Sequence, residues 1–81
     1  MRTEEVIIYY NEPDEKVYIK VRPGIETYYQ LQNLSGKVLQ EAHHILPLHD
    51  FDLTGFPEGN YFVLVTQGEK LYSKKIRKED H

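Results

Sequence analysis

Residues 56–78, FPEGNYFVLVTQGEKLYSKKIRK, contain a turn, an apolar run, a second turn and a basic final segment. The apolar run, NYFVLVT at 60–66, is hydrophobic on both of its alternating faces, which is typical of a central strand covered on both sides. The second turn, QGE at 67–69, joins this run to a segment that ends in four cations within five residues. We therefore expect an antiparallel β-hairpin whose outgoing strand carries its charge near the end.

The rest of the chain shows the same period of two in shorter segments. Clusters of Pro, Gly, Asn and Asp recur at roughly the 8 to 12 residue spacing of small all-β domains. Residues 16–22 and 25–33 alternate clearly, whereas residues 37–44, KVLQEAHH, alternate less cleanly and fit an edge strand. One face of the two clear segments is formed by Val17, Ile19, Val21, Ile25, Thr27, Tyr29 and Leu31.

These patterns predict a fold class. We expect an all-β fold, a small immunoglobulin-like antiparallel β-sandwich of six to seven strands, with residues 1–81 forming a single domain. A chain of 81 residues buries only about 60 to 65% of its unfolded surface, so the core should be thin. The expected centre of this core consists of Val17, Ile19, Tyr61, Val63 and Val65.

Composition excludes several classes of function. The chain has no cysteine, which excludes disulfides, thiolate metal sites and thiol nucleophiles. Its net charge of −3 argues against nucleic acid as a partner, because nucleic-acid binding needs a clustered basic surface. No apolar run approaches the roughly 20 residues of a membrane-spanning helix.

The segment EAHHILPLHD, residues 41–50, raises the question of a metal site. His43 and His44 are adjacent, so on a strand they point to opposite faces and cannot hold one ion together. His49 follows a proline and would reach them only if the loop folds back. We therefore expect surface histidines, no metal site and no cofactor.

Acidic residues are frequent, but a domain this thin has little room for a cleft between two catalytic carboxylates. Ser35 and Ser73 lack the glycine pattern of a nucleophile elbow. A hydrolase that uses His43, His49 and Asp50 is one functional hypothesis. The main expectation is a protein with no catalytic residues.

Seven of the ten aromatic residues are tyrosine. An exposed tyrosine strip would suit sugar or peptide binding, because each ring combines a large apolar area with a polar hydroxyl. In the alternative interpretation, one tyrosine of each adjacent pair lies in the core and the other covers a sheet face. Tyr18 and Tyr28 are the candidate ligand-binding residues, within a group that also contains Tyr9, Tyr10 and Tyr29.

Several residues have structural roles that the local sequence suggests. Gly36 in NLSGK should supply a positive φ in a tight turn between two strands. Gly59 should relieve the turn before the buried strand, and Tyr61 should pack inward with its hydroxyl tying down a loop. The final cations Lys74, Lys75, Arg77 and Lys78 should keep the last strand soluble and discourage edge-to-edge pairing.

The stretch FDLTGFPEGNYFVLVTQGEKLYSKKIRK, residues 51–78, resembles the end of the C-terminal sorting domains of the type IX secretion system. Leu53, Pro57, Gly59 and Tyr61 match that family's turn and strand start, and Gly68 matches its hairpin. The basic close of the family is matched by Lys75, Ile76 and Lys78. Upstream, Leu31, Gly36, Lys37 and Val38 fall in register, so the resemblance covers the chain from about residue 16.

The resemblance implies a non-enzymatic accessory module of a periplasmic, secreted or cell-surface protein. Secretion machinery is the implied partner, and Lys74, Lys75, Arg77 and Lys78 are the residues that it would recognise. Family members usually begin with a Pro-Asn-Pro-like motif, of which only Pro13 is present in YYNEPDEKVYI. The alternative is a free-standing secreted β-sandwich that binds a protein or a glycan through a tyrosine-rich face.

A further expectation concerns the first strand, EEVIIYY at residues 4–10. If it lies at a sheet edge, its uncovered apolar edge is a template for strand addition by a neighbouring chain.

Overall fold

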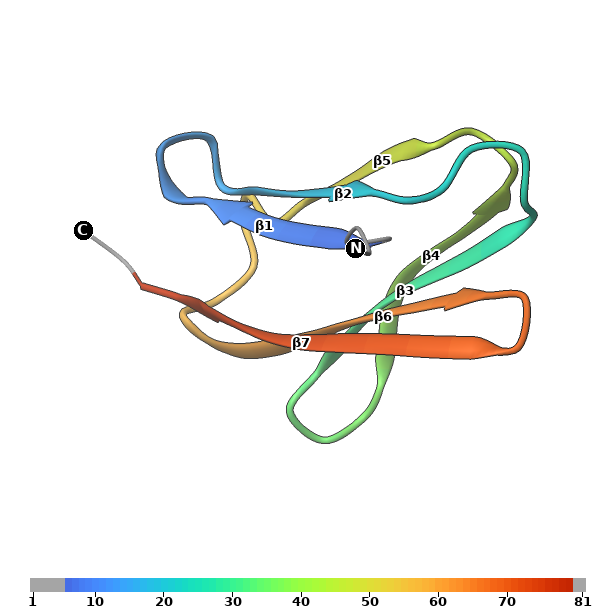
Figure 1. Ribbon diagram of the computed structural model, residues 1–81. Helices are drawn as coiled ribbons and strands as arrows, with labels where there is room; N and C mark the ends of the chain where they lie inside the picture. The colour runs from blue at the N-terminus through green and yellow to red at the C-terminus, as the bar shows by residue number, and fades with distance from the viewer. Residues whose placement is uncertain (1–5, 80–81) are drawn as a thin grey trace.

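Two antiparallel sheets packed face to face make up the computed structural model, which describes residues 6–79 (Figure 1). The three-stranded sheet has the order β1-β2-β5, with β1 at Ile7–Asn11, β2 at Lys16–Lys20 and β5 at Leu48–Asp52. The four-stranded sheet has the order β4-β3-β6-β7, with β4 at Val38–His44, β3 at Thr27–Asn33, β6 at Gly59–Gln67 and β7 at Lys70–Lys78.

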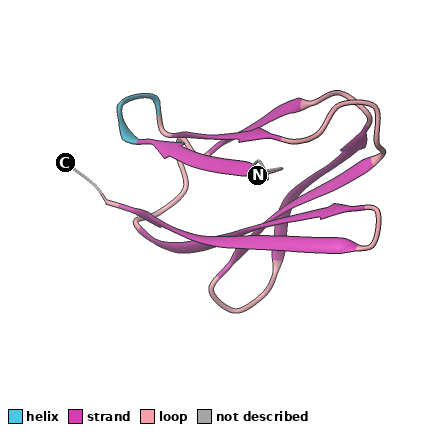
Figure 2. Cartoon of the chain, in the orientation of Figure 1, coloured by secondary structure: helices cyan, strands magenta, loops and turns pink. Residues whose placement is uncertain are grey.

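Strands and loops make up nearly all of the described chain (Figure 2). The helical segment is one 3-10 turn at Glu12–Asp14, which links β1 to β2. Within residues 6–79, no helix has the length and apolar character needed to cross a lipid bilayer. The expected all-β sandwich of six to seven strands is therefore confirmed, with seven strands among the described residues.

The core lies between the two sheets and follows the period of two. Val17 and Ile19 face inward from β2, and Tyr61, Val63 and Val65 face inward from β6, with none of these side chains more than 4% exposed. The inward row of β3 is buried as well and consists of Thr27, Tyr29 and Leu31. These assignments confirm the predicted core.

The prediction that β6 is covered on both sides is wrong. The strand is central, because it pairs with β3 on one side and β7 on the other. Its outward residues Phe62 and Leu64 are only half-buried. The reason is that residues 6–79 form a sandwich of two layers, and none of their elements covers the outer face of either sheet.

Strand β4 is an edge strand, as its irregular alternation predicted. It pairs with β3 alone, and the register shifts between Leu31 and Gln32. The β3–β4 turn is closed by Asn33, whose Oδ1 accepts hydrogen bonds from the backbone nitrogens of Ser35 and Lys37 at 3.1 and 2.9 Å. Gly36 has a φ of +91° in this turn, so the predicted requirement for glycine is confirmed.

The connection between β5 and β6 is anchored at several points. Leu53 is fully buried, and its backbone nitrogen donates to the Glu15 carbonyl at 2.8 Å. Gly59 begins β6 with a φ of +151°, a backbone conformation that other residues rarely adopt. The Tyr61 hydroxyl donates to the carbonyl of Pro57, four residues upstream. This is the tyrosine corner of immunoglobulin-like sandwiches, and it confirms the role expected for Tyr61.

Strand β1 is an edge strand of the three-stranded sheet, because it pairs with β2 alone. It begins at Ile7, and the Glu4 and Glu5 positions of the expected strand lie outside the described residues.

Candidate functional site

Strand β7 lies at an edge of the four-stranded sheet and has nine residues, which makes it the longest edge strand described. The central strand β6 has the same length. Pairing with β6 occupies one side of its backbone, and the other side forms the edge of the four-stranded sheet. Its side chains alternate between the two faces of that sheet. Because Ile76 is buried, its neighbours at 74 and 78 face inward and those at 75 and 77 face outward.

The two inward cations bind backbone carbonyls. Lys74 donates from Nζ to the carbonyl of Ile8 in β1 at 2.9 Å, which links an edge of each sheet. Lys78 donates to the Phe56 carbonyl at 2.5 Å and lies 4.0 Å from a Glu15 carboxylate oxygen. With 3% exposure, Lys78 is buried. The expectation that it is an exposed edge charge is therefore wrong, because strand parity directs it toward the other layer.

The two outward cations, Lys75 and Arg77, are exposed. Arg77 lies 3.6 Å from Glu58 and 3.4 Å from Glu79, and all three side chains are about half exposed. Such surface ion pairs are worth little and leave the guanidinium accessible. Among the described residues, the Lys75 side chain has no hydrogen-bond or ion-pair partner. These two side chains therefore present positive charge beside the strand edge.

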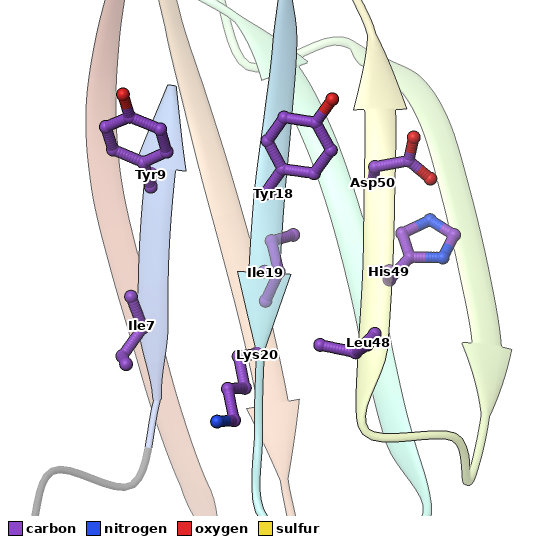
Figure 3. A pocket seen from close by; sticks show the side chains of 8 residues that line it. All are labelled: Ile7, Tyr9, Tyr18, Ile19, Lys20, Leu48, His49 and Asp50. Atoms are coloured by element: carbon purple, nitrogen blue, oxygen red, sulfur yellow. The ribbon is translucent and has the colours of Figure 1, made fainter. Parts of the chain in front are cut away.

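The outer face of the three-stranded sheet has a different chemistry. Tyr9, Tyr18 and Asp50 lie directly opposite one another across β1, β2 and β5, and Ile7, Lys20 and Leu48 form the adjacent row. Figure 3 shows the Tyr9 ring lying over β1 and the Tyr18 ring lying over β2. Together these side chains line a shallow hollow of about 430 Å³.

The hydroxyls of the two tyrosines are held by neighbouring side chains. Tyr18 donates to the Asp14 carboxylate, and this hydrogen bond raises the pKa of Tyr18 to about 12. The same bond lowers the pKa of Asp14, because it stabilises the carboxylate form. Tyr9 donates to Asn11 Oδ1 at 3.4 Å.

The hypothesis of a single exposed strip of tyrosines is wrong. Tyr28 lies on the outer face of the other sheet, where it contacts His43 edge to face and donates to Glu41 at 3.2 Å. Tyr29 is buried, and Tyr10 is half-buried against the core. Tyr18 and Tyr28 belong to opposite faces because each is outward in its own layer. The alternative interpretation, one tyrosine of each pair in or against the core, holds for both pairs.

The structure brings His44 and His49 together, and both are half-buried, so the expectation of surface histidines is wrong for these two. His44 Nε2 lies 3.1 Å from His49 Nδ1, between the sheets, and the His49 ring stacks on Tyr29. The backbone nitrogen of Leu46 donates to His44 Nδ1, so the hydrogen between the rings is carried by His44 Nε2. Burial lowers the pKa of His49, and the neighbouring His44 ring lowers it further.

The hydrolase hypothesis fails on geometry. His43 is on the outer face of the four-stranded sheet, His49 lies between the sheets, and Asp50 is on the outer face of the three-stranded sheet. Within residues 6–79, no group of three or more His, Cys, Asp or Glu side chains is placed to hold a metal ion. The three residues therefore do not form one site.

Comparison with known proteins adds the family. The family described as secretion system C-terminal sorting domain matches residues 7–79. The chain belongs to this family. Karilysin of Tannerella forsythia is 32% identical over 78 residues, which are 95% of this chain and 16% of karilysin, so the chain spans a small part of that relative's length. Members of this type IX sorting-domain family are recognised by secretion machinery, and their proteins are secreted or attached to the cell surface.

The sorting-domain motifs map onto the fold as a unit. Leu53, Pro57, Gly59 and Tyr61 build the β5–β6 connection, and Gly68 lies in the β6–β7 turn with a φ of +64°. The match reaches further upstream than the resemblance from about residue 16 indicated, because it includes β1. These motif residues therefore have structural roles in the sandwich, independent of any role in sorting.

Sequence reasoning missed the His44–His49 contact. A signal was present in the alternation, because Tyr29, Ala42 and His44 all occupy inward positions of the paired strands β3 and β4. The missing information was the path of the 45–47 loop. It crosses from one sheet to the other and is fixed by a 2.8 Å hydrogen bond from the Val21 nitrogen to the Pro47 carbonyl.

Proposed function

We propose that this domain is the non-enzymatic sorting module of an exported protein, and that secretion machinery binds it along β7. The observation that carries the proposal is the division of the final cations into two pairs. Lys74 and Lys78 point toward the other sheet and bind its side of the fold through backbone carbonyls, although only Lys78 is buried. Lys75 and Arg77 point outward and are exposed beside the open edge. The machinery would read the outward pair.

An open strand edge is a general recognition surface. A partner strand can add to it through main-chain hydrogen bonds, while side chains on the two faces give specificity. Charged side chains on β7 disfavour pairing between two copies of the same edge, because like charges would meet. The outward cations would therefore select a partner strand or loop that carries acidic residues.

A secretion assay tests this function. Residues 1–81 are fused to the C-terminal end of a reporter passenger in a host with type IX secretion, and passenger is measured in the medium, at the cell surface and in the periplasm. We expect the fusion to leave the periplasm. Periplasmic retention of the unaltered fusion would show that the domain does not act as a sorting module.

Charge reversal tests the role of the outward pair. The double variant Lys75→Glu, Arg77→Glu should retain most of the passenger in the periplasm, because its charge would repel an acidic partner. The matched control is Lys20→Glu, Arg22→Glu, which reverses two exposed charges away from β7 and should be secreted normally. Equal secretion of both folded variants would mean that the machinery reads something other than these cations.

A further inference from the structure

The outer face of the three-stranded sheet exposes more apolar surface than its folding requires. Exposure is 49% for Ile7, 56% for Tyr9, 39% for Tyr18 and 64% for Leu48, and the four side chains occupy two adjacent rows. A contiguous apolar patch rimmed by polar groups commonly marks a binding surface. This face is separate from the outer face of β7.

We propose that this face binds an uncharged, hydroxyl-rich carbohydrate, with Tyr9 and Tyr18 as the stacking platform. Figure 3 shows the two rings side by side, with broad faces turned away from the sandwich interior. The face of an aromatic ring is negative, so it attracts the weakly positive C–H groups on the flat side of a sugar ring. Hydroxyls around the sugar rim would then reach the polar groups that frame the platform.

The platform is held in place before any ligand binds. Tyr9 and Tyr18 are directly opposed across two paired strands, and their hydroxyls are bonded to Asn11 and Asp14. Little side-chain freedom remains to be lost on binding, which favours affinity for a small ligand.

The framing groups suit a neutral ligand. The Asp50 carboxylate lies in the same row as Tyr18, half exposed, with Lys16 Nζ 3.9 Å away. Lys20 belongs to the next row. Carboxylates accept hydrogen bonds from hydroxyls and ammonium groups donate to them, so both signs are useful here. Asp14 and Asp52 also lie near Tyr18, so the carboxylates outnumber the two lysines and a strongly acidic ligand is disfavoured.

The size of the face argues against a protein partner. Three strands of five residues each, at about 3.3 Å per residue and about 4.8 Å between strands, give an area of roughly 200 Å². A stable interface between proteins buries about 800 Å² on each partner. A second copy of this chain would have to bury further surface beyond this face, whereas a hollow of about 430 Å³ is by itself in the range of small-ligand sites.

Affinity electrophoresis tests the proposal directly. The whole 81-residue chain is run in native gels that contain soluble mannan, dextran or xylan, and in gels that contain polygalacturonate as an acidic probe. We expect retardation by at least one neutral polysaccharide and none by polygalacturonate. In the retarding gel, Tyr9→Ala and Tyr18→Ala should each weaken binding at least tenfold. Tyr28→Ala, which removes an exposed tyrosine from the opposite face, should bind normally.

A second measurement covers the case in which an alanine variant fails to fold. Amide chemical shifts of the unaltered protein, recorded as the retarding polysaccharide is added, should change in β1, β2 and β5 and stay constant in β7. The proposal is overturned if no neutral polysaccharide retards the protein, or if the acidic one alone does. The proposal is also overturned if Tyr28→Ala weakens polysaccharide binding as much as Tyr9→Ala and Tyr18→Ala do. Self-association of the protein that Tyr9→Ala abolishes would overturn it as well.

Discussion

The outer faces of the two sheets differ sharply, although their inner faces follow the same rule. Near the end of β7, the four-stranded sheet presents Lys75 and Arg77 beside an open strand edge. The three-stranded sheet presents an apolar face centred on Tyr9 and Tyr18. Inward positions are set by the need to fill a thin core, so outward positions are where such a domain can carry distinct recognition chemistry.

The largest expected effect comes from destabilising the common core, on which both outer faces depend. Leu53→Ala leaves a cavity at a fully buried position, which should lower the free energy of unfolding by about 2–5 kcal/mol. Urea denaturation measures this loss, and secretion and polysaccharide retardation should fail in parallel. If one activity survived the loss of folded structure, the two faces would not depend on a common core.

The next effect separates the two kinds of cation within β7. Lys78→Ala leaves the Phe56 carbonyl without its charged donor and should destabilise the fold by about 1.5–3 kcal/mol. Lys75→Ala should change stability by no more than about 0.5 kcal/mol, because its side chain is on the surface. Urea midpoints of the two variants give the comparison. Equal midpoints would contradict the division of β7 into an inner and an outer pair.

The sequence predicts the inner face far better than the outer ones. A period of two is a direct signal for a half-buried strand, so Val17, Ile19 and Val63 were assigned correctly from spacing alone. The same rule would have placed Lys78 inward beside Ile76, but a buried lysine is rare, and charge alone suggested the surface. Its burial depends on the Phe56 carbonyl, which lies in a distant loop and leaves no local pattern.

Low pH should lower the stability of the fold through the His44–His49 contact, in which His49 belongs to β5 of the three-stranded sheet. The pKa of His49 in the fold is below its ordinary value of 6.5. The unfolded chain therefore takes up a proton at His49 more readily than the folded chain. Stability from this site is complete above about pH 6.5 and is lost as the pH falls toward the lowered pKa of the folded state.

Unfolding free energies measured between pH 7.5 and 5.5 would test this sign. We expect stability to fall with the pH, and His49→Gln should make the fall shallower. The control is His43→Gln, which alters an exposed histidine beside Glu26 and should keep the slope of the unaltered protein. A steeper loss in His49→Gln, or the same flattening in His43→Gln, would contradict a role for the contact between the sheets.

The smallest expected effect compares one tyrosine from each outer face. Tyr18→Ala and Tyr28→Ala each remove an exposed ring, so both should shift the urea midpoint less than Lys78→Ala does. Only Tyr18→Ala should alter polysaccharide binding. A large loss of stability from either variant would mean that its ring has a structural role beyond covering the sheet.

The candidate surfaces were predictable in composition but not in grouping. Tyrosines and final cations are visible in the sequence as potential binding residues. Whether Tyr18 joins Tyr9 or Tyr28 depends on which strands share a sheet, and that is decided by the crossing from β4 to β5. Such a crossing is a long-range event between distant segments, for which the local alternation contains no signal.

The parity of β7 has a consequence for how this chain can change over time. Deleting one residue between the β6–β7 turn and Lys74 would rotate the end of the strand by half a turn. Arg77 would then point into the sandwich and Ile76 into water. Substitutions at the outward sites are tolerated by the fold, whereas insertions and deletions of odd length are not, so variation in this strand should preserve length more strictly than identity.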